Sequence, residues 1–80
     1  MPRYLVERTF ADGWDLAHVP GMSASEGVTW VHSYVTPDRH RSFCIVESPS
    51  PQAVRAAALA AGLPVDRITE VRVLFPHFLL

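Results

Sequence analysis

The stretch from Gly27 to Glu47, GVTWVHSYVTPDRHRSFCIVE, constrains the fold more than any other part of the chain. Both of its halves are rich in the β-branched and aromatic residues that favour strands. Between the halves, Pro37 presets the backbone of a corner, and Asp38 can accept hydrogen bonds from nearby backbone groups. The stretch therefore predicts a β-hairpin, whose turn would be closed by pairing Thr36 with Arg41.

The two faces of this hairpin differ in character, because successive side chains of a strand point to opposite faces. One face is expected to belong to the core and carries Val31, Val35, Cys44 and Val46. The other face would bring together the cross-strand pairs Tyr34 with Phe43, His32 with Ile45 and Trp30 with Glu47. Aromatic rings beside a histidine and a carboxylate are unusual both for a core and for a solvated surface. This second face is therefore the first place to look for function.

Two further strands are expected outside the hairpin, at residues 3–10 and 67–75. Residues 11–26 are the least regular part of the chain and leave room for a short helix at most. The order of strand, shortened crossover, hairpin, helix and strand is the βαββαβ pattern of an α+β, ferredoxin-like fold. Its antiparallel sheet has the strand order 4-1-3-2, with helices on one face and the other face open. Residues 1–80 are expected to form a single domain of this kind.

The clearest helix is expected between Ser48 and Gly62. Ser50 is a favourable N-cap, expected to bond to the backbone of Gln52 or Ala53, and a glycine at the other end favours a left-handed terminator. The apolar stripe of this helix consists mostly of alanine, which predicts close packing against the sheet.

Charge and composition argue against several classes of function. The formal net charge is −1 and the chain has no run of basic residues, so nucleic-acid binding and a membrane-surface role are not expected. A single cysteine cannot form an internal disulfide, and no apolar run approaches the roughly 18 residues that span a bilayer. Without a signal-peptide pattern, the expected location is the cytoplasm.

Four segments resemble a known family: MPRYLVERTF, EGVTWVHSYV, FCIVESPSPQAVRAAA and AGLPVDRITEVRVL. They are similar to a family of short, largely uncharacterised bacterial domains typified by an actinobacterial nickel-binding protein. The resemblance implies a dimeric ferredoxin-like fold and a role in binding nickel. Relatives have a longer segment before EGVTW, which implies that the first helix is shortened or missing here.

Polar side chains expected on the open face form a candidate metal site. One imidazole and three carboxylates are expected there, from His32, Glu7, Glu47 and Glu70. Neutral imidazole with carboxylate suits a divalent transition ion such as Ni²⁺, Zn²⁺ or Cu²⁺, and only the resemblance favours nickel. The surrounding pocket is expected to be lined by Trp30, Tyr34, Phe43 and Arg72.

The same residues leave other interpretations open. Crowded carboxylates raise each other's pKa, which suits acid–base chemistry, so the cavity could belong to a dimeric α/β-barrel enzyme or to a small-ligand-binding protein. Alternatively, the carboxylates pair with Arg8, Arg67 or Arg72, and the histidine bonds a carbonyl. In either case, the apolar side chains of the open face predict a homodimer. The preferred hypothesis is a homodimer that binds a divalent metal, and whether the protein is an enzyme stays open.

Overall fold

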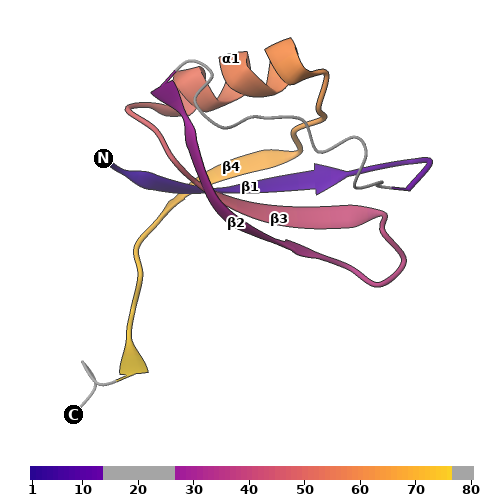
Figure 1. Cartoon of the computed structure of the whole chain (residues 1–80), viewed down its shortest axis with the longest axis horizontal. Helices are drawn as coiled ribbons and strands as arrows, with labels where there is room; N and C mark the ends of the chain where they lie inside the picture. Colours follow the sequence, from indigo (N-terminus) through magenta and orange to yellow (C-terminus); the bar gives the residue numbers. More distant parts are fainter. Residues whose placement is uncertain (14–26, 77–80) are drawn as a thin grey trace.

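The computed structural model describes residues 1–13 and 27–76. Its elements are β1 (Arg3–Thr9), β2 (Thr29–Val35), β3 (Arg41–Glu47), α1 (Pro51–Ala61) and β4 (Arg67–Val71) (Figure 1). The strands form one antiparallel sheet in the order β2-β3-β1-β4. This is the predicted α+β, ferredoxin-like order, 4-1-3-2, read from the opposite edge. The expected shortening of the first helix concerns a segment that lies mostly outside the described residues.

The turn between β2 and β3 closes as predicted. The backbone N–H of Thr36 donates to the carbonyl of Arg41 over 3.0 Å. The carboxylate of Asp38 accepts from the Thr36 hydroxyl at 2.6 Å and from the backbone N–H of His40 at 3.0 Å. These two hydrogen bonds lower the pKa of Asp38, with the hydroxyl as the larger cause. Arg39 completes the turn with a φ of 64°.

Helix α1 begins and ends as the sequence predicts. The hydroxyl of Ser50 accepts a hydrogen bond of 3.1 Å from the backbone N–H of Ala53, so Ser50 is the N-cap. Gly62 ends the helix with a φ of 70°, a left-handed conformation that glycine adopts without a steric penalty. The buried face of α1 consists of Val54, Ala57 and Ala58, and Val54 and Ala57 join residues of the sheet in the core.

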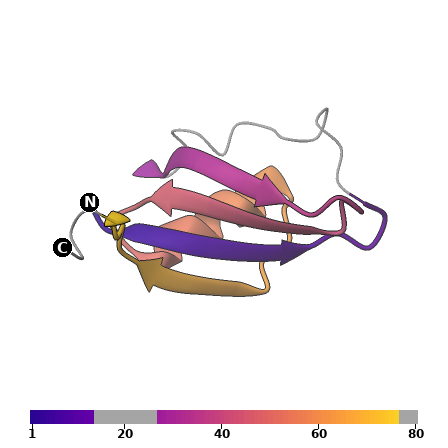
Figure 2. The same ribbon diagram turned by 90° about the horizontal axis from the view of Figure 1, so that it is seen from below.

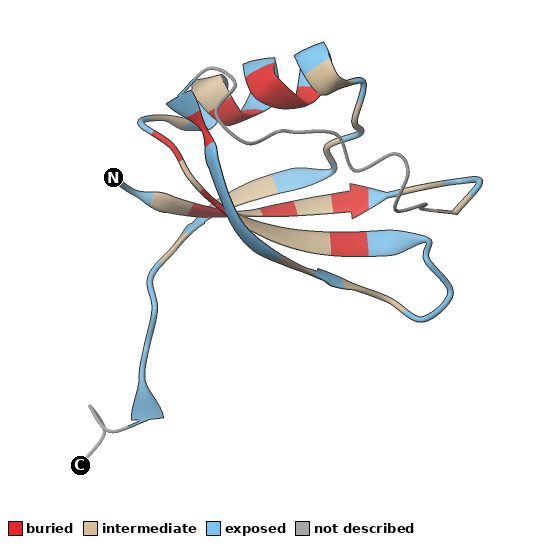
Figure 3. Cartoon of the chain, in the orientation of Figure 1, coloured by how far each residue is buried: buried red, intermediate tan, exposed pale blue. Residues whose placement is uncertain are grey.

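The core lies between α1 and one face of the sheet, where the buried residues gather (Figure 3). It comprises Tyr4, Val6, Val28, Val46, Val54 and Ala57. Arg8 continues the same face of β1 and is only 1 % exposed. Burial lowers the pKa of its guanidinium, while the neighbouring thiol of Cys44 acts in the opposite direction.

A β-bulge in β2 changes which side chains share a face. Trp30 pairs with Val46 and His32 with Ile45, which leaves Val31 as an extra residue between the two pairs. The expectation that Val31 belongs to the core is wrong, since its side chain is exposed. Trp30 moves to the face covered by α1, where its indole N–H donates to the hydroxyl of Ser33 over 2.8 Å.

Strand β4 is shorter than the expected residues 67–75. Its last residue, Val71, pairs with Arg3, the first residue of β1. The residue before Arg3 is Pro2, which has no backbone N–H with which to continue the ladder. Residues 72–76 leave the sheet on the side opposite α1 (Figure 1). Within the described ranges, no helix is long and apolar enough to cross a membrane.

Candidate functional site

The candidate site is the sheet face that α1 leaves uncovered, which we call the open face. Seen from below, all four strands lie in front of α1 (Figure 2). The pairing registers place these side chains on the open face: Arg3, Leu5, Glu7, Thr9, Thr29, His32, Tyr34, Arg41, Phe43, Ile45, Glu47, Arg67, Thr69 and Val71.

The centre of the open face is apolar. Leu5 of β1 lies opposite Ile45 of β3, and Phe43 follows two residues before Ile45 on the same strand. All three side chains are half-buried, even though α1 packs on the opposite face of the sheet and does not cover them. Tyr34, opposite Phe43 as predicted, is 65 % exposed. Apolar side chains grouped in this way favour contact with another molecule.

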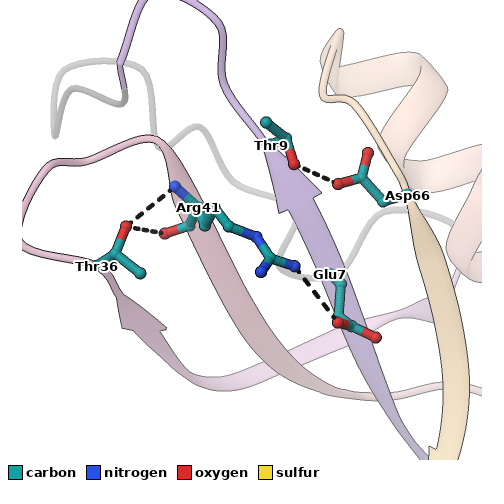
Figure 4. Close-up of polar contacts among 5 residues, drawn as sticks. All are labelled: Glu7, Thr9, Thr36, Arg41 and Asp66. Atoms are coloured by element: carbon teal, nitrogen blue, oxygen red, sulfur yellow. Dashed lines mark hydrogen bonds and ion pairs between the residues drawn. The ribbon is translucent and has the colours of Figure 1, made fainter.

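Both carboxylates of the open face pair with arginine. The guanidinium of Arg41 lies 3.7 Å from Oε1 of Glu7 (Figure 4) and also covers the ring of Phe43, 5.0 Å from its centroid. Nη2 and Nε of Arg3 lie 3.1 and 3.2 Å from Oε1 of Glu47. Arginine pairing of such carboxylates was foreseen, but with Arg8, Arg67 or Arg72; of these, Arg67 does lie opposite Glu7 on β4. The observed partners depend on the pairing register of β1 and β3, which sets Arg3 beside Glu47 and Arg41 near Glu7 and which the sequence alone did not reveal.

His32 is the imidazole of the open face. It is exposed and meets the ring of Tyr34 edge to face, with centroids 5.3 Å apart. Because His32 lies opposite Ile45, Glu47 is its diagonal neighbour on the adjacent strand. Such positions are separated by about 7–8 Å between Cα atoms, within reach of long side chains. His32 and Glu47 are therefore the pair of predicted ligands that the sheet brings closest together.

The other two predicted ligands lie apart from this pair. Glu7 is on the open face, but four residues along β1 from the position opposite Glu47, which is about 13 Å at the rise of a strand. This separation also removes the crowding of carboxylates on which the acid–base hypothesis depends. Glu70 lies opposite Tyr4 and therefore on the face of the sheet that carries α1. The expectation that Glu70 is on the open face is wrong.

The predicted pocket is likewise only partly assembled. Tyr34 and Phe43 are on the open face, whereas the bulge carries Trp30 to the other face and Arg72 lies beyond the end of β4. Among residues 1–13 and 27–76, no group of three or more His, Cys, Asp or Glu side chains could hold a metal ion. One described chain therefore offers an incomplete metal site.

Comparisons with known proteins agree with the resemblance seen in the sequence. A family described as "Nickel responsive protein SCO4226-like" matches residues 4–71. The crystal structure of SCO4226 from Streptomyces coelicolor A3(2) is similar, with a TM-score of 0.72 over 91 % of this chain and 99 % of that chain. The two sequences are 21 % identical, so this likeness supports the fold. A comparison with curated proteins finds no match.

Proposed function

Because the chain belongs to the nickel responsive protein SCO4226-like family, we propose that it is a nickel-binding homodimer whose metal site is shared between two copies. His32 and Glu47 are the proposed ligands in each copy. The observation that carries the proposal is their diagonal placement on an open face where a single described chain lacks a third donor.

The chemistry of the two donors suits nickel. Imidazole nitrogen binds Ni²⁺ well, and carboxylate oxygen is a common second ligand. Both contacts from Arg3 to Glu47 end on the same oxygen, Oε1, and a carboxylate has a second oxygen with which to bind a cation. His32 is exposed, so its ring can turn toward a metal at the cost of its edge contact with Tyr34.

Two-fold symmetry supplies the missing donors. In an isologous dimer each copy presents the same patch to the other, so two donors per chain become four around the axis. Burial of the apolar side chains Leu5, Phe43 and Ile45 between two open faces gives such a dimer a driving force. The metal then lies between the copies, and binding and dimerisation stabilise each other.

Calorimetric titration of Ni²⁺ into the untagged protein tests the proposal. We expect one ion for every two chains, and light scattering should report twice the mass of the chain. His32→Ala and Glu47→Gln each remove a proposed ligand. Each should weaken nickel binding by more than the roughly 10- to 100-fold loss that follows mutation of a residue hydrogen-bonded to a metal ligand. The matched controls are His40→Gln, in the turn, and Glu70→Gln, on the covered face. Both controls should bind as the wild type does.

Acidification provides a further check. The imidazole must be neutral to bind, so nickel affinity should fall as the pH is lowered. Tight binding by the His32→Ala variant, or one ion on a monomeric chain, would contradict the shared site. A bound organic molecule in native mass spectra, together with no response to nickel, would favour the small-ligand hypothesis instead.

A further inference from the structure

We propose that residues 72–76, which we call the C-terminal arm, clasp the second copy of the chain in the homodimer. The proposal rests on the proposed function, from which it takes the partner on the open face. It adds a second contact surface to that dimer, built from a segment that lies outside the sheet.

The direction of the C-terminal arm is the first observation. The arm follows β4, whose last residue, Val71, belongs to the open face. From there it runs away from the sheet on the side opposite α1 (Figure 1). A second copy packed on the open face would occupy that same side. The arm therefore stands where it would flank a partner.

The composition of the C-terminal arm is the second observation. Val73 is 46 % exposed and Leu74 is 69 % exposed. Neither belongs to the core cluster formed by the sheet and α1. Holding two large apolar side chains in water is unfavourable, and burying them against another apolar surface removes that cost. A partner on the open face provides a surface on which they can be buried.

Apolar side chains occur both on the open face and in the arm. Val71 lies on the open face at the end of β4, and Val73 follows two residues later. Val71 lies opposite Arg3, and two residues further along β1 the half-buried Leu5, with Ile45 opposite it, occupies the middle of the same face. Because a two-fold dimer repeats every contact, each copy would both give an arm and receive one. This doubles the effect of the arm on association.

The first experiment measures the dimer dissociation constant of the full chain by sedimentation equilibrium. The double variant Val73→Ser, Leu74→Ser should raise that constant at least about 100-fold, since two arms each lose apolar contacts worth roughly tenfold or more. Leu59→Ser is the matched control, because Leu59 is 82 % exposed on α1, away from the open face. It should leave the constant within about twofold, as expected for an exposed site outside the interface.

The second experiment locates the arm directly. A photo-crosslinking benzoylphenylalanine replaces Leu74, and equal amounts of this protein and ¹⁵N-labelled wild type are mixed before irradiation. Crosslinks that join a labelled chain to an unlabelled one at residues of the open face support the clasp. Crosslinks confined to single chains would show that the arm folds back on its own sheet and would overturn the proposal.

The outcomes separate this proposal from the function on which it rests. If the wild type dimerises and binds nickel but the double variant dimerises equally well, the arm proposal alone fails. If the wild type is monomeric with nickel present, the proposed function fails and the clasp fails with it. If the double variant dissociates more readily yet binds nickel at high chain concentration, both are supported.

Discussion

The two faces of the sheet are made by the same strands but reach different degrees of burial. On the covered face, Val6 and Val46 are fully buried against α1. On the open face, Ile45, the neighbour of Val46 in the chain, is only half-buried, and Tyr34 is 65 % exposed. A single chain therefore buries the apolar side chains of the covered face fully, but those of the open face only in part.

The polar groups of the open face do not account for this difference. The pair of Arg3 with Glu47 leaves about a third of each side chain exposed, at 36 % and 31 %. Ion pairs with such access to solvent contribute at most about 1 kcal/mol to stability. The half-buried apolar side chains between the ion pairs have the larger energy still to gain, through burial of the surface that they expose. The comparison teaches that the free energy of the covered face belongs to folding, and in the proposed dimer that of the open face would belong to association.

The largest expected effect comes from two neighbouring residues on opposite faces. Val46→Ala should lower the free energy of unfolding by about 2 kcal/mol, because it leaves a cavity in the core. Ile45→Ala should cost less in unfolding but raise the dimer dissociation constant at least about tenfold. Urea denaturation of dilute protein and sedimentation equilibrium measure the two quantities. If both variants changed the same quantity by the same amount, the distinction between the faces would be wrong.

A smaller effect is expected at the start of α1, the element that makes one face different from the other. Ser50→Ala removes the acceptor for the backbone N–H of Ala53 and should lower the free energy of unfolding by about 1 kcal/mol. Ser50→Asp retains an acceptor and should keep most of the stability. Urea midpoints of the two variants and the wild type provide the measurement. An unchanged midpoint in Ser50→Ala would mean that the cap contributes nothing.

The smallest effect is expected in the exposed turn between β2 and β3, which is closed by hydrogen bonds among its own residues. Because the pKa of Asp38 is lowered in the folded protein, its charged carboxylate stabilises the fold at pH values above the ordinary aspartate pKa, near 4. This stabilisation is lost as the pH falls through the lowered pKa. The stability difference between wild type and Asp38→Asn should therefore be present at pH 7 and vanish in acid. Urea denaturation over this pH range measures it.

Thr36 provides the control for that measurement. Its hydroxyl is the larger cause of the lowered pKa of Asp38, so in a Thr36→Val background the difference made by Asp38→Asn should shrink. A difference that stays constant from pH 7 into acid would show that the charge of Asp38 has no part in the stability of the turn.

Local patterns in the sequence predicted most of the fold. The turn at Pro37 and Asp38, the cap at Ser50 and the terminator at Gly62 all depend on residues close together in the chain. Their conformational preferences act within a few residues and need no tertiary partner. The order of elements followed from these local signals, and with it came the ferredoxin-like sheet. On the open face, His32, Tyr34, Phe43 and Glu7 were placed correctly for the same reason.

Tertiary pairing alone decided the remaining features of the candidate site. The bulge at Val31 moved Trp30 to the covered face, and the register of β4 put Glu70 there as well. In β4 both faces mix apolar and polar residues, Ile68 with Glu70 on one and Val71 with Arg67 and Thr69 on the other, so its pattern could not select one. Side chains alternate with a period of two, and a shift of one residue therefore exchanges the faces of a whole strand. The sequence by itself determined which segments become strands, whereas backbone hydrogen bonding between strands distant in the chain determined which of their side chains meet.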